Sequence, residues 1–528
     1  MRRERDRGGM TRGLGVSRAG TARRAWRPSP ACGMSADPQG AHPRTNGARI
    51  AIPSRSTHVS SAVAPPVPAG VTQPIPRALL RLAVPAFFSF GLRVAYQWVD
   101  ALWVRGLGVD ATAAVTSSMF VVWWIYSLND IFAIGVTAYV SQLLGAGDRG
   151  RAGVAAFKGI RAAALLGLVA TTAGLFAARG IYALMGAAPG VTDQGGHYLS
   201  IVLGAAPISM MALTCDSIMR SAGDTRTPLV IDLCAVALNA ILDPLLIYGL
   251  GPFPAMGVAG AAWATVAAQT TMLIGYLVVA ARGARAFPLA TRAAGPPVRI
   301  GGMARVGLPA AIIGMLFSVV YIALARSAAR FGPASMATVG IVNRIEAIQF
   351  MTGGAIGTAA SALVGQNLGA RQPAWAVQAI WTGVRWVAVI ALVLSAVFIA
   401  FPHVFIGFFT ADPEVHRVGA PYLRVLSLCL VFVGVEVVAS EAILGSGHTT
   451  AISWIYSIVS LLRIPLAFWV PDWTGSGVIG IAWLISVTCT VRALVIVAWV
   501  ARGSWQRGLH HELHGGAVPP PPTPPGAV

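Results

Sequence analysis

Twelve long apolar segments dominate this sequence of 528 residues. An α-helix needs about 20 apolar residues to cross the hydrocarbon core of a bilayer, and each segment is long enough. Charged residues make up 11% of the chain, whereas a soluble domain has about 25%. The sequence therefore excludes an ordinary soluble enzyme and predicts an all-α polytopic membrane protein. We place the twelve transmembrane helices at 79–104, 112–144, 154–178, 195–222, 227–249, 255–281, 303–330, 335–366, 377–402, 418–446, 450–471 and 476–501.

Two polar tails flank the apolar region. Residues 1–76 carry 12 Arg against 3 acids and lack apolar periodicity, which predicts a disordered basic cytoplasmic tail. The tail has no apolar stretch of the kind found in secretory signals, and Met10 or Met34 is an alternative start. Residues 506–528 form a Pro-rich tail that we also expect to be disordered.

Positive charge is uneven between the two sides of the predicted bundle. Connections on the side of the N-terminus carry most of the basic residues, including Arg149, Lys158 and Arg282, whereas the opposite side carries few, such as Arg105 and Arg179. Basic connections tend to stay in the cytoplasm, so both termini are predicted to be cytoplasmic in a cell (plasma) membrane. The net charge of +20 is thus a topology signal and gives no evidence for a nucleic-acid partner.

The chain repeats itself at an offset of 224 in the numbering. Pro85 matches Pro309, and the run 142–146 (QLLGA) matches 366–370 (QNLGA). Each repeat holds six predicted helices, and six is even, so both halves enter the membrane in the same direction. The prediction is two parallel six-helix bundles, with an N-terminal lobe over 77–282, a cytoplasmic linker over 283–302 and a C-terminal lobe over 303–505.

Several motifs, taken in order, resemble those of the multidrug and toxic compound extrusion (MATE) family, and most closely its prokaryotic DNA-damage-inducible branch. They are VDALWVRGLGVDATAAV (99–115), SQLLGAGDRGRA (141–152), IMRSAGDTRTP (218–228), NAILDPLLIYGLG (239–251) and LVGQNLGA (363–370). The resemblance implies an antiporter in which inward flow of H⁺ or Na⁺ drives export of bulky, often cationic amphipathic compounds. It also implies two lobes that open alternately to each side of the membrane.

Acidic residues inside the first six segments have no acidic counterparts at the offset of 224, which suggests an ion site within the N-terminal lobe. Asn239 and Asp243 lie one turn apart on one helix face, and Pro244 leaves the carbonyl of Ala240 without its helical donor. These oxygens suit Na⁺, and a carboxyl group in apolar surroundings can instead carry a proton. The alternative is polar contact between helices.

The resemblance adds Asp100 and Thr265 to Asn239 and Asp243 as the coupling-ion site. An interfacial acid that pairs with Arg105 is the alternative for Asp100.

Asp216 stands where the family often has Asn. We expect it to add a second carboxylate to the coupling-ion site and to favour protons; the alternative is an ion pair with Arg220, one turn later. Arg93, two turns before Asp100, is expected to influence the charge state of that acid.

Glu346 and Asp130 are candidate residues of a substrate cavity. For Glu346 the alternative is a structural pair with an arginine such as Arg463, and for Asp130 it is a structural role.

Aromatic residues near the predicted outer ends of the first two helices fit an interfacial belt better than drug-stacking positions; they are Tyr96, Trp98, Trp103, Trp123, Trp124 and Tyr126. Plain packing is the simpler interpretation of the apolar residues Met315, Phe317, Phe350 and Met351, and an adaptable cavity wall is the alternative.

The function predicted from these features is secondary-active export, without enzymatic activity, cofactor or metal centre beyond a transported H⁺ or Na⁺. No GxxxxGK[ST], HExxH or DDxxD motif occurs. The expected partners are a small-molecule substrate and membrane lipid, and we expect a monomer. Alternatives are a flippase for lipids or polysaccharide precursors, an intramembrane enzyme, and a membrane scaffold acting through the basic tail.

Overall fold

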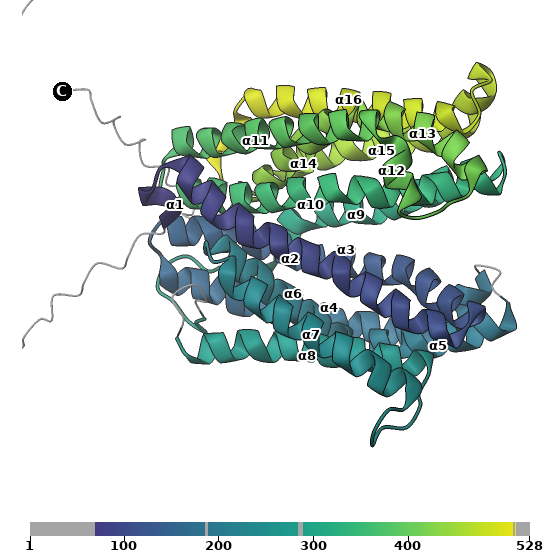
Figure 1. Ribbon diagram of the computed structural model, residues 1–528. Coiled ribbons are helices and arrows are strands. Elements are labelled where there is room, and N and C mark those ends of the chain that lie inside the picture. Colours follow the sequence, from purple (N-terminus) through teal and green to yellow (C-terminus); the bar gives the residue numbers. More distant parts are fainter. Residues whose placement is uncertain (1–68, 185–187, 284–288, 510–512, 514–528) are drawn as a thin grey trace, which may run out of the picture. The chain divides into compact units, whose positions relative to one another are not determined.

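The structure is a computed structural model and describes residues 69–528 except 185–187, 284–288, 510–512 and 514–528. Contacts place these described residues in one compact unit. Within its described part all regular structure is helical, and long helices run side by side in two groups (Figure 1). The all-α prediction is confirmed.

The first group, here called the N-lobe, follows the short helix α1 (Ala69–Thr72). It consists of α2 (Ile75–Val104), the 3₁₀ turn η1 (Arg105–Leu107), α3 (Val109–Gly145), α4 (Arg149–Leu184), α5 (Pro189–Gly204), α6 (Ala206–Ser221), α7 (Arg226–Tyr248) and α8 (Val258–Ala281).

The second group, the C-lobe, repeats this order. It consists of α9 (Ile300–Ala329), α10 (Pro333–Gly369), α11 (Pro373–Ala400), α12 (Pro402–Gly407), α13 (Pro413–Ser427), α14 (Leu430–Leu444), α15 (Thr449–Thr474) and α16 (Val478–Ala501), and the 3₁₀ turn η2 (Ser504–Arg507) follows it.

Ten helices of the described region are long and apolar enough to cross a membrane. The pairs α5–α6 and α13–α14 bend by 54° and 52°, and the number is twelve if each pair is one span. These pairs correspond to the predicted spans 195–222 and 418–446. The predicted twelve-helix architecture is therefore present, with two spans broken in the middle.

The two breaks are stabilised in the same way. Pro207 has no N–H to donate to the carbonyl of Leu203, and the Thr171 hydroxyl donates to that carbonyl at 2.7 Å. At the second break the Ser395 hydroxyl donates to the carbonyl of Ser427 at 2.5 Å. The offset of 224 converts Thr171 into Ser395 and Leu203 into Ser427, so the sequence repeat is also a repeat of local contacts.

The lobes hold each other at the end of the bundle where the chain enters α2 and leaves α16, called here the tail end. The Gln142 amide donates to the carbonyl of Gly445 at 2.9 Å, and the Gln366 amide donates to the carbonyl of Ser221 at 2.9 Å. Each bond joins the two lobes, and the offset of 224 converts one into the other. This reciprocal pair is what two parallel bundles related by a two-fold pseudo-axis predict.

The structure differs from the prediction of disorder at parts of the two predicted tails. Residues 1–68 of the predicted N-terminal tail lie outside the described residues, whereas α1 (Ala69–Thr72) and the start of α2 at Ile75 are helical, with Val71 and Ile75 buried. At the other end, Trp505, Leu509 and Leu513 are buried. The prediction of disorder is wrong at these last two positions, because both side chains pack into the apolar core of the N-lobe.

Candidate functional site

Three buried polar residues share one face of α7. Asp232, Asn239 and Asp243 are separated by seven and four residues, which brings them to the same side of a helix. Asn239 and Asp243 have no solvent exposure, and Asp232 has 2%. Pro244 lies inside the helix and cannot donate to the carbonyl of Ala240. The face of α7 that points into the N-lobe is therefore its polar one.

Asp100 of α2 meets this face near Asp243. The residue is 8% exposed, and its carboxyl group lies close enough to Asp243 and Asn239 to interact with both. The Asn239 amide donates to Oδ1 of Asp243 at 3.4 Å. One side-chain oxygen of each of these three residues is buried without a hydrogen-bond partner among the described residues. Buried oxygens normally have partners, so this cluster has unused capacity for a proton or a cation.

Thr265 of α8 lies at the same site. It lines, together with Asp100, a cavity of about 80 Å³, and its hydroxyl donates to the carbonyl of Ala261 at 3.0 Å. Tyr96 and Tyr198 also line this cavity. The structure thus brings together four of the five residues predicted for the coupling-ion site.

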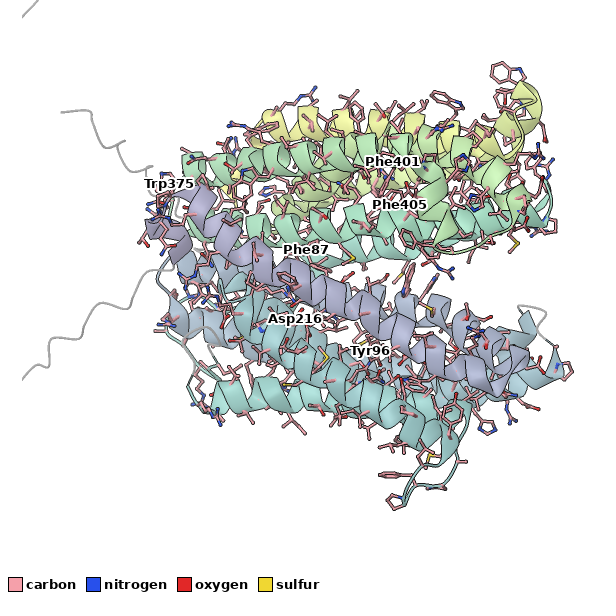
Figure 2. All side chains as sticks on the ribbon, viewed as in Figure 1. Phe87, Tyr96, Asp216, Trp375, Phe401 and Phe405 are labelled. Atoms are coloured by element: carbon pink, nitrogen blue, oxygen red, sulfur yellow. The ribbon has the colours of Figure 1, made fainter. Side chains whose placement is uncertain are left out.

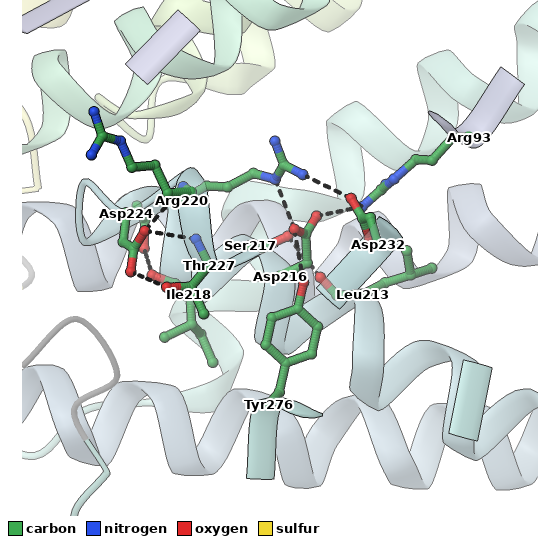
Figure 3. A network of polar contacts seen from close by, with 12 residues as sticks. Arg93, Leu213, Asp216, Ser217, Ile218, Arg220, Asp224, Thr227, Asp232 and Tyr276 are labelled. Carbon is green, nitrogen blue, oxygen red and sulfur yellow. Dashed lines mark hydrogen bonds and ion pairs between the residues drawn. The ribbon is translucent and has the colours of Figure 1, made fainter. Parts of the chain in front are cut away.

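The fifth predicted residue, Asp216 of α6, lies elsewhere. Its carboxylate accepts hydrogen bonds from Arg93 and Arg220, each at 2.8 Å, and from the Tyr276 hydroxyl at 3.1 Å. Figure 3 shows these contacts, with Asp232 opposite. The ion pair with Arg220 that the sequence offered as the alternative is present, and a role of Asp216 in ion coupling stays a prediction.

Arg93 also differs from expectation, since it pairs with Asp216 rather than with Asp100. Seven residues of helix separate Arg93 from Asp100, which corresponds to about 10.5 Å along the axis. Asp232 completes the group, 3.7 Å from Arg93 and 3.6 Å from Arg220. We call these four residues (Arg93, Asp216, Arg220 and Asp232) the ion-pair network; its two positive and two negative charges balance.

A larger cavity of about 380 Å³ connects the two polar groups. Tyr96, Tyr126 and Gln269 line both this cavity and the smaller one, and its far wall reaches Asp216 and Asp232. In Figure 2, Tyr96 and Asp216 lie in the same group of helices. The two cavities therefore adjoin at these shared residues, and their walls together extend from Asp100 to the ion-pair network.

Three aromatic residues predicted to form an interfacial belt instead line these cavities: Tyr96, Trp123 and Tyr126. Trp123 also contacts Phe317 of the C-lobe, with ring centroids 6.3 Å apart. The belt interpretation is wrong for all three. Trp103 and Trp124 are exposed on the bundle, and for them the belt remains a prediction; the side chain of Trp98 lies outside the described set.

The two predicted substrate-cavity residues have different surroundings. Asp130 of α3 lines the 380 Å³ cavity. Glu346 is buried inside the C-lobe, near enough to Arg463 to interact with it. The Arg463 guanidinium in turn donates to the Thr488 hydroxyl at 3.0 Å. For Glu346 these surroundings favour the structural alternative.

Sequence reasoning missed Asp232 and a buried ion pair in the C-lobe. Glu436 and Arg492 approach to 2.6 Å, both with little exposure. The spacing of seven between Asp232 and Asn239 was a usable signal, since it places both on one helix face. Neither Glu436 nor Arg492 offers such a signal, because they lie on two different helices, α14 and α16, with all of α15 between them in the sequence.

Repeated six-helix halves with buried acids inside membrane-spanning helices are typical of a membrane transporter. The family model described as MatE matches residues 85–245 and 309–469, and the offset of 224 converts the first of these segments into the second. The chain belongs to the MATE family of transporters, as the sequence motifs indicated, and is a multi-pass membrane protein without enzymatic activity.

Curated relatives cover most of the chain. A protein named FAD transporter from Shewanella oneidensis is 26% identical over 75% of this chain and 88% of its own length. The probable multidrug resistance protein NorM from Thermotoga maritima is 25% identical over 82% and 94%. The multidrug export protein MepA from Staphylococcus aureus is 22% identical over 80% and 94%.

Solved structures confirm the fold. A MATE family transporter of the MOP superfamily, described in an outward-facing conformation, superposes with a TM-score of 0.77 at 23% identity. A MOP superfamily transporter from Pyrococcus furiosus superposes with a TM-score of 0.76, also at 23% identity. Each comparison covers 83% of this chain and 98% of the other.

Proposed function

We propose that this protein is an antiporter of the plasma membrane that exports cationic amphipathic compounds in exchange for H⁺ or Na⁺. The observation that carries the proposal is the buried cluster of Asp100, Asn239 and Asp243, whose side-chain oxygens lack partners. Thr265 stands beside it. Buried acids inside a membrane protein are costly and commonly mark ion pathways.

The exchange follows from charge in this cluster. Two acids held close together in an apolar interior repel each other when both are ionised, and an incoming proton or Na⁺ removes that repulsion. Asp100 belongs to α2 and Asp243 to α7, so occupation of the site changes how these two helices pack. Such a change closes the substrate cavity toward the outside, and the cavity reopens toward the cytoplasm as the ion leaves.

A cationic load is favoured by the walls of the 380 Å³ cavity. Asp216 and Asp232 line it as members of the balanced ion-pair network, and Asp130 adds one acid outside that network. Trp123 supplies an aromatic face for a cation. A flippase for lipids or polysaccharide precursors remains the alternative within this superfamily, and it is expected to carry a more cationic cavity.

Asp243→Asn tests the proposal. The variant keeps the shape of the side chain and removes its charge, so we expect loss of gradient-driven export from proteoliposomes. Insertion and folding should be retained, as checked by size-exclusion chromatography. Efflux is measured separately under an imposed pH gradient and an imposed Na⁺ gradient, which identifies the coupling ion. Undiminished export by the variant would refute the proposal.

One relative suggests a second candidate load. The Shewanella oneidensis relative is named FAD transporter, and Arg93 gives the cavity one positive group that remains 35% exposed. Flavin efflux from the same proteoliposomes tests this candidate. Export of a flavin without export of a cationic dye would show that the substrate is anionic and would contradict the proposed cationic substrate.

A further inference from the structure

A third cavity, of about 220 Å³, lies between the lobes near the tail end. Asp130 and Ser217 of the N-lobe line it, and so do Ser361 and Glu441 of the C-lobe. The offset of 224 relates Ser217 to Glu441, and it relates Thr137, which also lines the cavity, to Ser361. The cavity therefore lies on the two-fold pseudo-axis, where separation of the lobes would open it.

Its two acids come from opposite lobes, and neither forms an ion pair with a basic side chain among the residues that the structure describes. Asp130 and Glu441 are close enough to repel each other when ionised. Arg220 also lines the cavity, but its Nε binds Asp216 and its Nη2 approaches Asp232. Its Nη1 has no hydrogen-bond partner among the described residues. Because the four charges of the ion-pair network balance, the net charge of the cavity lining is that of Asp130 and Glu441.

A second observation is a buried polar group that is free to bind a ligand in this cavity. Ser361 is 3% exposed, and its hydroxyl has no hydrogen-bond partner among the described residues although it lines this cavity. Further hydroxyl groups of Thr137, Ser217 and Thr358 surround the same space. Carboxylate and hydroxyl oxygens from both lobes are the donors that a small cation needs.

We propose that Asp130 and Glu441 form a cation-binding latch between the lobes, separate from the coupling-ion site, and that a monovalent cation held there allows the tail end to close. This proposal rests on the exporter function proposed above. With the latch empty, two ionised acids face each other and push the lobes apart. With a cation between them, the attraction joins one lobe to the other.

The cation has two sources with the same chemistry, the coupling ion and the ammonium group of a substrate. Other charged groups facing the latch are Asp216 and Arg220 of α6, shown in Figure 3. The lining contributed by α2 and α10 (Phe90, Thr358, Ser361 and Ala362) has no titratable group. A pH response of the latch therefore belongs to Asp130 and Glu441, since Asp216 is held by two arginines.

The test measures the distance between the lobes at the tail end. Spin labels are attached through Arg226→Cys and Arg502→Cys, two exposed positions on different lobes, with the five native cysteines replaced by serine. Distances are recorded in lipid nanodiscs over a pH series with N-methyl-D-glucamine as the bulk cation. At high pH, Na⁺ or tetramethylammonium is then added.

We expect a short distance at low pH and a longer one at high pH, because ionisation of both acids separates the lobes. Restoration of the short distance by Na⁺ identifies the coupling ion as a ligand, and restoration by tetramethylammonium identifies the substrate's ammonium group. If only protons close the interface, the latch binds a proton. A distance that responds to none of the three would overturn the proposal.

Asp130→Asn combined with Glu441→Gln should abolish the pH response and leave the lobes closed, and each single variant should reduce it. Glu414→Gln is the matched control, because that acid is exposed and paired with Arg417; it should keep the full response. A full response in the double variant would contradict the latch. Asp243→Asn should keep the response while losing export, so the two proposals fail separately.

Discussion

At the scale of single residues, the two acids of the ion-pair network, Asp216 and Asp232, differ in how closely the arginines bind them. Asp216 receives two arginine hydrogen bonds at 2.8 Å and one from Tyr276. Asp232 lies 3.6–3.7 Å from the same arginines, and neither of its oxygens has a hydrogen-bond partner among the described residues. Replacing Asp216 therefore removes direct hydrogen bonds to both arginines, whereas replacing Asp232 removes only the longer ion-pair contacts.

Asp216→Asn is expected to destabilise the protein more than Asp232→Asn. Removing one member of a buried ion pair costs about 3–5 kcal/mol, and Asp216 loses direct hydrogen bonds as well. The free energy of unfolding of both variants is measured by chemical denaturation in detergent micelles. Equal losses would indicate that the four residues act as one unit, contrary to the distances.

The residues that the sequence predicted well are those with a local pattern. Asn239, Asp243 and Pro244 indicate their site through helix spacing and a missing donor, and the structure places Asp100 against them. Tyr96 and Trp123 were misassigned because membrane helices are apolar on several sides. Without a polar face, the sequence does not reveal whether an aromatic side chain meets lipid or a cavity.

At the scale of elements, helices α3 and α10 come into backbone contact at two glycines, Gly145 and Gly369. A Cβ atom placed on Gly145 would overlap the carbonyl oxygen of Gln366, and one placed on Gly369 would overlap that of Gln142. These two contacts are again related by the offset of 224. The helices cross at their closest where neither has a side chain.

Gly145→Ala and Gly369→Ala should each lower the free energy of unfolding by about 1–3 kcal/mol, because overpacking forces the backbones apart. Gly180→Ala is the control: it lies in α4 with no atom near its Cβ position, and replacing a helical glycine there should stabilise by about 0.5–1 kcal/mol. Unfolding of the three variants is compared in one detergent. A stabilising Gly145→Ala would show that the crossing is looser than described.

The predicted helices differ from the observed ones mainly where a tertiary partner decides the outcome. The apolar run over 195–222 predicts one span, and the bend at Ala205 depends on Thr171 as well as on Pro207. The corresponding bend after Ser427 depends on Ser395. A hydropathy pattern predicts the length of a span. It does not predict which side chain of a neighbouring helix donates a hydrogen bond to the free carbonyl at a break.

For the whole molecule, the repeat makes the lobes alike in fold and unlike in chemistry. At the offset of 224, Asn239 corresponds to Arg463 and Asp243 to Ala467. Arg463 is buried and donates to Thr488. The position that holds Asn239 in the N-lobe is thus occupied by a buried positive side chain in the C-lobe, so the proposed coupling-ion site has no acidic counterpart at these two positions.

The segment after α16 ties the two lobes together at the tail end. Trp505 packs into the apolar core that the C-lobe shares with the start of α2, whereas Leu509 and Leu513 pack into that of the N-lobe. The backbone N–H of Leu509 donates to the Gln142 side chain at 2.8 Å, and Arg151 donates to the carbonyl of Leu513 at 2.7 Å. Composition alone predicts disorder over most of this segment. Its few apolar residues are buried only through contacts with the two lobes, and composition does not reveal such contacts.

Truncation after Gly503 should therefore weaken closure of the tail end, whereas truncation after Leu513 should leave it unchanged. Each large apolar side chain that is removed from a core contributes about 1.5–3 kcal/mol, and Gln142 also loses a hydrogen bond. The spin-label distance between Arg226→Cys and Arg502→Cys reports closure, and thermal unfolding reports stability. If the shorter chain closes as fully as the longer one, the reciprocal bonds of Gln142 and Gln366 hold the tail end without this segment.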